Sequence, residues 1–137
     1  MKFEKHFPNL QSDGYKITSP ADVHYNCVAW AAGESNRWWE PAAHWPGDVS
    51  RTHTLDSFLS VFKSLGYEQC ENRLSETGKE KIALFANDGD ITHAARQLPD
   101  GRWTSKLGMN VDIEHSLEGL EGGVYGEVIQ AMSRAIG

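Results

Sequence analysis

Hydrophobic residues follow a helical spacing in the middle of the chain. After Thr54, a good helix N-cap residue, they recur three and four positions apart, and so share one face of a helix that Gly66 ends. These residues are Leu55, Phe58, Leu59, Phe62 and Leu65. A second, shorter helix is predicted over 27–32, with Asn26 as its N-cap and Gly33 at its end. Its small residues suit a helix that lies close against another layer.

Beyond this region the hydrophobic period changes to two, which predicts strands. They are predicted at 67–72, 81–87, 91–98 and 102–108, with tight turns at Asp88-Gly89 and Asp100-Gly101. The remaining segments are predicted as an irregular arm over 1–18, a helix start at 19–22, and C-terminal helices over 116–120 and 123–136. The order predicts one α+β domain over residues 1–137, in which the helix bearing Cys27 packs on a three- to four-stranded antiparallel sheet and a helix ends the chain.

Composition narrows the classes of partner. The chain has 137 residues, of which 39% are hydrophobic and 23% charged, as in an ordinary globular domain, and its formal net charge is −6. This acidic balance argues against a nucleic-acid partner and against an anionic membrane surface. No apolar run approaches the roughly 20 residues that span a bilayer, and no signal peptide is visible. A cytoplasmic location is therefore expected, with signal-independent secretion left open.

Cys27 and His93 are the residues that most suggest chemistry. Cys27 follows a capping residue at a predicted helix N-terminus, where the helix dipole favours a thiolate. His93 lies on a predicted strand beside two alanines, which leave space for a helix to approach. Together they form the nucleophile and base that a thiol-dependent hydrolase requires. The alternatives are a buried packing cysteine and a strand histidine bonded to a backbone carbonyl.

A third group would orient the imidazole, and the sequence leaves several candidates. Ser105 and Lys106 lie on the next predicted strand, and Asn110 and Asp112 follow it. Which of Ser105 and Lys106 lies on the same face of the sheet as His93 depends on the loop before that strand. A two-residue loop puts Lys106 on the face of His93, whereas a three-residue bulged loop puts Ser105 there.

The segments Tyr25–Ala31 and Thr92–Gln97 resemble the papain-like cysteine hydrolase superfamily, including its NlpC/P60, CHAP and transglutaminase-like branches. The chain from Ile17 to Gly108 also resembles a family of small uncharacterised bacterial proteins. The first resemblance implies a papain-like fold, a Cys27–His93 pair and no cofactor. The third position in that superfamily is usually His, Asn, Asp or Gln, and here the spacing matches Ser105. No Gln precedes Cys27, so the Cys27 backbone N–H and the Asn26 side chain are the candidate oxyanion donors.

Two kinds of function follow from these residues. The first is a cysteine hydrolase or acyl-transferase that acts on a small amide, a peptide or a protein side chain, as a housekeeping amidase or as a toxin or effector. The second is a non-catalytic binding or immunity-type domain that uses the tryptophan-rich loop as its recognition surface. Trp38, Trp39 and Trp45 would line a substrate cleft in the first case. Neither the two cysteines nor the histidines show a metal-ligand spacing, so no metal is expected.

Overall fold

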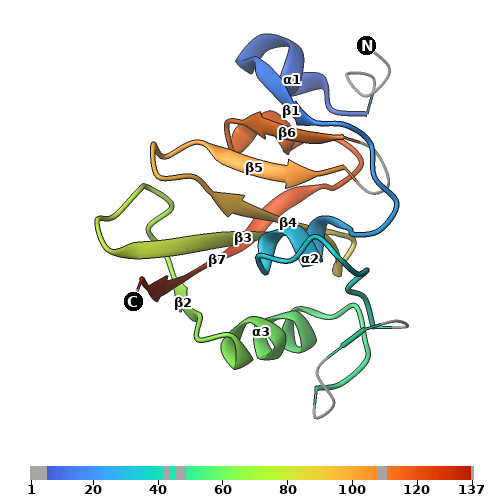
Figure 1. The fold of residues 1–137 in the computed structure, drawn as a ribbon, viewed down its shortest axis with the longest axis vertical. Coiled ribbons are helices and arrows are strands. Elements are labelled where there is room, and N and C mark those ends of the chain that lie inside the picture. Colours follow the sequence, from blue (N-terminus) through green and yellow to red (C-terminus); the bar gives the residue numbers. More distant parts are fainter. Residues whose placement is uncertain (1–5, 42–43, 46–48, 108–110, 137) are drawn as a thin grey trace.

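The computed structural model describes residues 6–41, 44–45, 49–107 and 111–136. Seven strands form a single antiparallel sheet in the order β1-β6-β5-β4-β3-β7-β2 (Figure 1). The strands are β1 (Tyr15–Ser19), β2 (Glu68–Cys70), β3 (Lys79–Asn87), β4 (Asp90–Gln97), β5 (Trp103–Lys106), β6 (Asp112–His115) and β7 (Glu127–Ala135). The helices are α1 (Pro8–Asp13), α2 (Cys27–Ala31), α3 (Leu55–Ser64) and the short 3₁₀ helix η2 (Glu118–Leu120).

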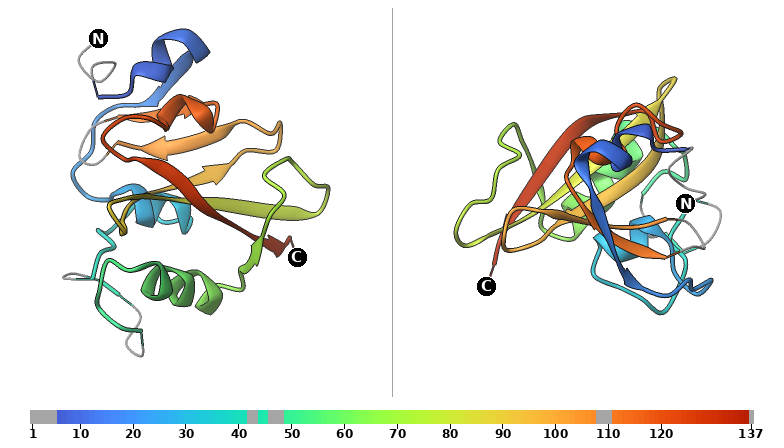
Figure 2. Two further views of the ribbon diagram at one scale, coloured as in Figure 1. Left: turned by 180° about the vertical axis from the view of Figure 1, so that it is seen from behind. Right: turned by 90° about the horizontal axis from the view of Figure 1, so that it is seen from above.

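The sheet has a hydrophobic cluster on each face. The α2 cluster lies between the sheet and helices α2 and α3, which run along one side of it in Figure 1. Its members are Tyr25, Val28, Ala29, Ala31, Trp39, Trp45, Phe58, Leu59, Val61, Phe62, Tyr67, Ile82, Leu84, Ile91, Ala94 and Met132. The α1 cluster lies on the other face, under α1 and η2, which lie together at the end of the molecule away from α3 (Figure 2). Its members are Phe7, Leu10, Ala83, Phe85, Ala95, Trp103, Leu107, Ile113, Leu117, Leu120 and Val128.

Two extra residues interrupt the alternation of the strands. In β4, His93 pairs with Phe85 but Ile91 pairs with Ala86, so Thr92 is an extra residue. In β7, Ile129 is extra in the same way, opposite the step from Leu84 to Phe85. A bulge of this kind shifts every later side chain to the other face of the sheet.

The predicted papain-like α+β fold is wrong, because the chain forms a seven-stranded, β-rich sheet with few short helices instead of a helix on three or four strands. The predicted helix over 123–136 is strand β7, which pairs with both β3 and β2. The predicted irregular arm contains α1 and β1, and β1 pairs with β6. No helix forms at the start predicted over 19–22. The short helix at Cys27, the amphipathic helix after Thr54 and the four strands β2 to β5 were predicted at these places.

Candidate functional site

Helix α2 carries Cys27 onto the centre of the sheet. Asn26 caps this helix, since its Oδ1 accepts a hydrogen bond from the Ala29 N–H at 3.1 Å. The Trp30 indole Nε1 donates to Thr104 Oγ1 on β5 at 3.0 Å and anchors the helix to the sheet. Cys27, at the first helical position, is partly buried against the α2 cluster.

The bulge at Thr92 determines where His93 lies. Ile91, before the bulge, belongs to the α2 cluster, whereas the His93 ring contacts the aromatic rings on the other face. It stacks on Tyr125 with ring centroids 4.0 Å apart and meets the Phe85 ring edge-on at 5.2 Å. Regular alternation would have put Ile91 and His93 on one face, so the extra residue is what brings His93 to its position.

A chain of hydrogen bonds runs from His93 across two strands to a backbone carbonyl. His93 Nε2 lies 2.9 Å from Ser105 Oγ on β5, and Ser105 Oγ lies 2.7 Å from His115 Nε2 on β6. His115 Nδ1 lies 2.6 Å from the carbonyl oxygen of Ser116. All three side chains are fully buried, which keeps water from competing for these bonds.

The direction of each proton in this chain follows from its last member. A carbonyl oxygen only accepts, so the neutral His115 ring carries its proton on Nδ1, and its Nε2 only accepts. Ser105 Oγ therefore donates its single proton to His115 and accepts from His93 Nε2. His93 thus carries its proton on Nε2, and its Nδ1 keeps a lone pair. Nδ1 is buried and has no hydrogen-bond partner in the part of the chain that the structure describes.

Burial keeps both histidines neutral at neutral pH. Desolvation holds the pKa of His93 well below its usual value, and the nearby His115 adds to this effect. Desolvation likewise lowers the pKa of His115 to about 4, although its bond to the Ser116 carbonyl opposes the change. The proton directions above hold when both His93 and His115 are neutral.

Cys27 is also held neutral, contrary to the thiolate predicted from its place at a helix N-terminus. Burial raises the pKa of the Cys27 thiol, and hydrogen bonding from the backbone N–H of Ala94 opposes the rise without cancelling it. The five-residue helix α2 offers only a short dipole to set against this burial. In the resting state both the thiol and the imidazole are therefore uncharged.

Cys27 and His93 line one small cavity of about 100 Å³. Its walls are nearly as polar as they are apolar, and Glu40, Thr92 and the exposed His53 contribute polar groups. The other lining residues are Asn26, Val28, Trp39, Pro41, Phe58 and Ile91. About three water molecules fit such a volume, so the cavity suits one short substituent and not a long chain.

The orienting residue that the structure places against His93 is Ser105. The loop before β5 is closed by Leu98 N–H donating to the Arg102 carbonyl, with three residues between them. The three-residue alternative is therefore the one observed, and it turns Ser105 toward His93 and Lys106 to the opposite face. Asp112 is fully buried and accepts a 2.7 Å hydrogen bond from the Tyr25 hydroxyl. Asn110 lies outside the described residues.

The predicted oxyanion and substrate-binding residues have mostly structural contacts. Asn26 accepts from the Trp39 N–H at 3.1 Å and donates to the Trp39 carbonyl at 2.6 Å, in addition to capping α2. Trp39 and Trp45 are buried in the α2 cluster, and Trp38 is half-buried. Of the three tryptophans only Trp39 is among the residues lining the cavity. The oxyanion role of the Asn26 side chain and of the Cys27 N–H stays a prediction.

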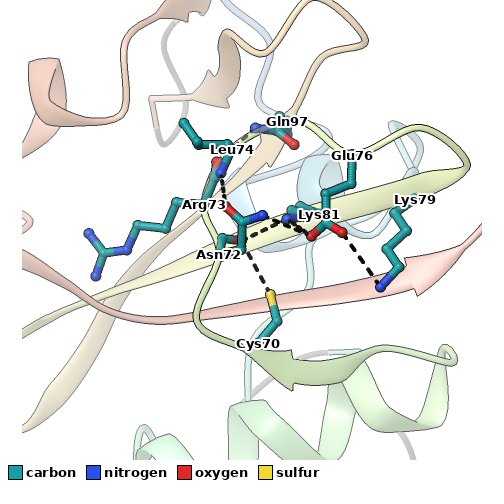
Figure 3. Close-up of polar contacts among 8 residues, drawn as sticks. All are labelled: Cys70, Asn72, Arg73, Leu74, Glu76, Lys79, Lys81 and Gln97. Atoms are coloured by element: carbon teal, nitrogen blue, oxygen red, sulfur yellow. Dashed lines mark hydrogen bonds and ion pairs between the residues drawn. The ribbon is translucent and has the colours of Figure 1, made fainter.

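A larger cavity, of about 320 Å³, lies at the other end of β4 and is lined by residues 75–80, 97–99 and 136. Beside it is the fully buried Lys81, whose Nζ donates to Glu76 Oε1 at 2.5 Å and to the Asn72 carbonyl at 2.7 Å (Figure 3). Glu76 also lies 3.8 Å from Lys79. These contacts hold the loop before β3 in place, and they include no pair of nucleophile and base.

Within the described ranges, no group of three or more His, Cys, Asp or Glu side chains is arranged to hold a metal ion. No helix there has the length and apolar character needed to cross a membrane.

Comparison with known families adds one finding. The model of a domain of unknown function, DUF7689, matches residues 16–133. The chain belongs to this family. The matched range takes in Cys27, His93, Ser105 and His115, so the whole hydrogen-bond chain lies inside the DUF7689 domain. No curated protein and no solved structure matches the chain.

His115 is the site residue that sequence reasoning missed. It lies ten positions after Ser105, and Ile113 and His115 alternate with Glu114 as buried residues do on a strand. Only the prediction of a strand over 112–115 would have put His115 on the face of Ser105. That four-residue segment starts close after β5 and carries two acids, so its β signal is weak.

Proposed function

We propose that the protein is a cysteine hydrolase or acyl-transferase in which Cys27 is the nucleophile and His93 the general base. Cys27 Sγ attacks an amide carbonyl carbon while its proton passes to His93 Nδ1. The tetrahedral adduct breaks its C–N bond, and the amine leaves with the proton from Nδ1. Water, or an acceptor amine or alcohol, attacks the thioester and gives its proton to Nδ1, which returns it to Cys27.

The observation that supports this function most is the fixed tautomer of His93. The hydrogen-bond chain through Ser105 and His115 leaves Nδ1 with a lone pair and, among the described residues, no hydrogen-bond partner, and His93 lines the same cavity as Cys27. A purely structural histidine would be expected to use both nitrogens, because an unsatisfied buried polar atom costs about 1–3 kcal/mol. A base awaiting a proton accounts for the empty position.

The small size of the cavity favours a substrate that presents a short amide-bearing group. A cavity of about 100 Å³ beside Cys27 holds a few heavy atoms, as in a small amide or the end of a side chain. Among the substrates expected from the sequence, a small amide or a protein side chain therefore fits better than an extended peptide.

The test is the pH dependence of alkylation by iodoacetamide, followed at each cysteine by mass spectrometry. Attack assisted by neutral His93 needs no free thiolate, so the Cys27 rate is expected to be nearly flat between about pH 6 and about pH 8. Cys70, a partly buried thiol on β2 far from His93 in the sheet order, is the internal reference. Its rate is expected to rise steeply with pH, because unassisted alkylation requires the thiolate.

His93→Gln is expected to make the Cys27 rate as steep in pH as that of Cys70, because the amide cannot take the proton. A Cys27 rate that follows Cys70 in the unmodified protein, and that His93→Gln leaves unchanged, would mean that Cys27 is a packing residue. The binding or immunity-type domain would then become the better hypothesis.

A further inference from the structure

A second group of buried polar residues lies on the α2 side of the sheet. Lys106 on β5 is fully buried, and its Nζ donates to the Asp22 carbonyl at 2.6 Å and lies 4.9 Å from the centre of the Tyr25 ring. Its cross-strand neighbour on β6 is Asp112, which accepts from the Tyr25 hydroxyl. Asp22 and Tyr25 lead directly into helix α2, so this group adjoins the helix that begins with Cys27.

Lys106 and Cys27 lie on the same side of the sheet, because helix α2 packs on β5 and Lys106 contacts Tyr25 just before that helix. Burial raises the pKa of Cys27, and the charge of Lys106 opposes that rise. Lys106 is fully buried and Cys27 half-buried, so an attraction between their charges is stronger than it would be at the surface. Burial lowers the pKa of Lys106, and the negative charges of Asp112, Asp22 and an ionised Cys27 oppose that change.

We propose that the Lys106 ammonium stabilises the negative charge that develops on Cys27 when the thiol reacts, an assignment that rests on the proposed cysteine chemistry. His93 takes the proton from one side, and Lys106 on the opposite face of the sheet supplies the compensating charge. Lys106 does not line the cavity, so it acts through Cys27 and is a positioning residue. It does not orient His93, because Ser105 does.

The test measures ionisation of Cys27 and not turnover, in a Cys70→Ser background that leaves one thiol. The thiolate is followed by its ultraviolet absorbance as the pH is raised. Lys106→Met keeps the length of the side chain but removes its charge, and is expected to reduce the thiolate fraction about tenfold at a given pH, which is one unit of pKa. Lys106→Arg, which keeps the charge, is expected to recover most of that loss.

The matched control is Lys81→Met. Lys81 and Lys106 are both 0% exposed, so the two substitutions remove an equally buried ammonium, but Lys81 is bonded to Glu76 and Asn72 in the loop before β3. It is expected to leave Cys27 ionisation unchanged. A threefold or smaller effect of Lys106→Met, or an equal effect of Lys81→Met, would overturn the proposal.

A measurement on the natural lysine covers the case in which Lys106→Met does not fold. Coupling between two sites is reciprocal, so removing the thiol must also change Lys106. In carbon NMR of labelled lysines, Lys106 is expected to lose its proton at lower pH in Cys27→Ser than in the wild type, and an identical titration would overturn the proposal. The His93→Gln alkylation result tests the proposed function separately, because it depends on the base and not on Lys106.

Discussion

At the scale of single residues, His115 decides the chemistry of His93 without touching the cavity. Its Nδ1–H bond to the Ser116 carbonyl forces its Nε2 to accept, which in turn forces Ser105 to accept from His93. The Ser116 carbonyl therefore determines, through His115 and Ser105, which nitrogen of His93 carries the proton, although His93 lies two strands away. The same rings are kept neutral by burial, which lowers the pKa of both.

This dependence predicts a change of tautomer in His115→Leu. Without an acceptor at His115, the Ser105 hydroxyl is free to donate to His93 Nε2, and the His93 proton moves to Nδ1. Nitrogen NMR of the ring is expected to show a proton on Nε2 of His93 in the wild type and on Nδ1 in the variant. The flat pH dependence of Cys27 alkylation is expected to disappear with it.

Ser105→Ala is the companion variant, since it removes the hydroxyl and with it both bonds. We expect His93 to lose its preference for one tautomer, and the protein to lose about 1–3 kcal/mol of stability because buried imidazole nitrogens are left unpaired. A His93 ring already protonated on Nδ1 in the wild type would contradict the proton directions argued here.

At the scale of elements, the predictions succeeded where a local signal marks the element and failed where only pairing with distant strands defines it. Thr54 and Asn26 mark the starts of α3 and α2 because capping depends on neighbouring residues alone. In β7, the extra residue Ile129 shifts the alternation, so the buried positions Val128, Ala131 and Met132 are spaced like one face of a helix. The pairing that makes this segment a strand lies on β3, more than 40 positions earlier, and no local period records it.

The same limit applied to the site. Residue type and position were enough to propose Cys27 and His93, whereas the face on which Ser105 and Lys106 lie depended on a three-residue loop. The bulge at Thr92 that turns His93 away from Ile91 left no sign in the sequence.

Asn26 links two elements, and this predicts a stability cost. Asn26→Ala removes the cap of α2 and both bonds to the Trp39 backbone, and is expected to lower the free energy of unfolding by about 2–3 kcal/mol in urea denaturation. Asn26→Ser keeps an N-cap oxygen and is expected to recover about 1 kcal/mol. Equal stability of the two variants would show that the cap contributes nothing and that only the Trp39 bonds matter.

At the scale of the whole molecule, the sheet separates charged buried groups on one face from neutral ones on the other. The face toward α2 holds the Lys106, Tyr25 and Asp112 group, which carries charge. The face toward α1 holds His93 and His115, which stay neutral among aromatic and aliphatic side chains. Cys27 and His93 line one cavity although Cys27 packs on the α2 face and the bulge in β4 turns His93 to the α1 face.

Keeping two neutral histidines buried makes the global stability depend on pH. Unfolded histidine takes up a proton near its usual pKa of about 6.5, whereas folded His115 does so only at about 4. Between these values the unfolded state binds more protons, so the free energy of unfolding falls as the pH falls. From about pH 7 to about pH 5, His115 alone is expected to cost about 2 kcal/mol, and His93 adds to the loss in the same direction.

Urea denaturation at these two pH values checks this expectation, since the carboxylates with lowered pKa titrate mainly below that range. His115→Gln is expected to remove the His115 share of the loss, whereas His6→Gln, which changes an exposed side chain, is expected to leave the loss unchanged. A wild-type stability that is the same at both pH values would mean that the folded histidines take up protons as readily as unfolded ones. Burial would then not hold their pKa low, which would contradict the neutral, buried pair argued here.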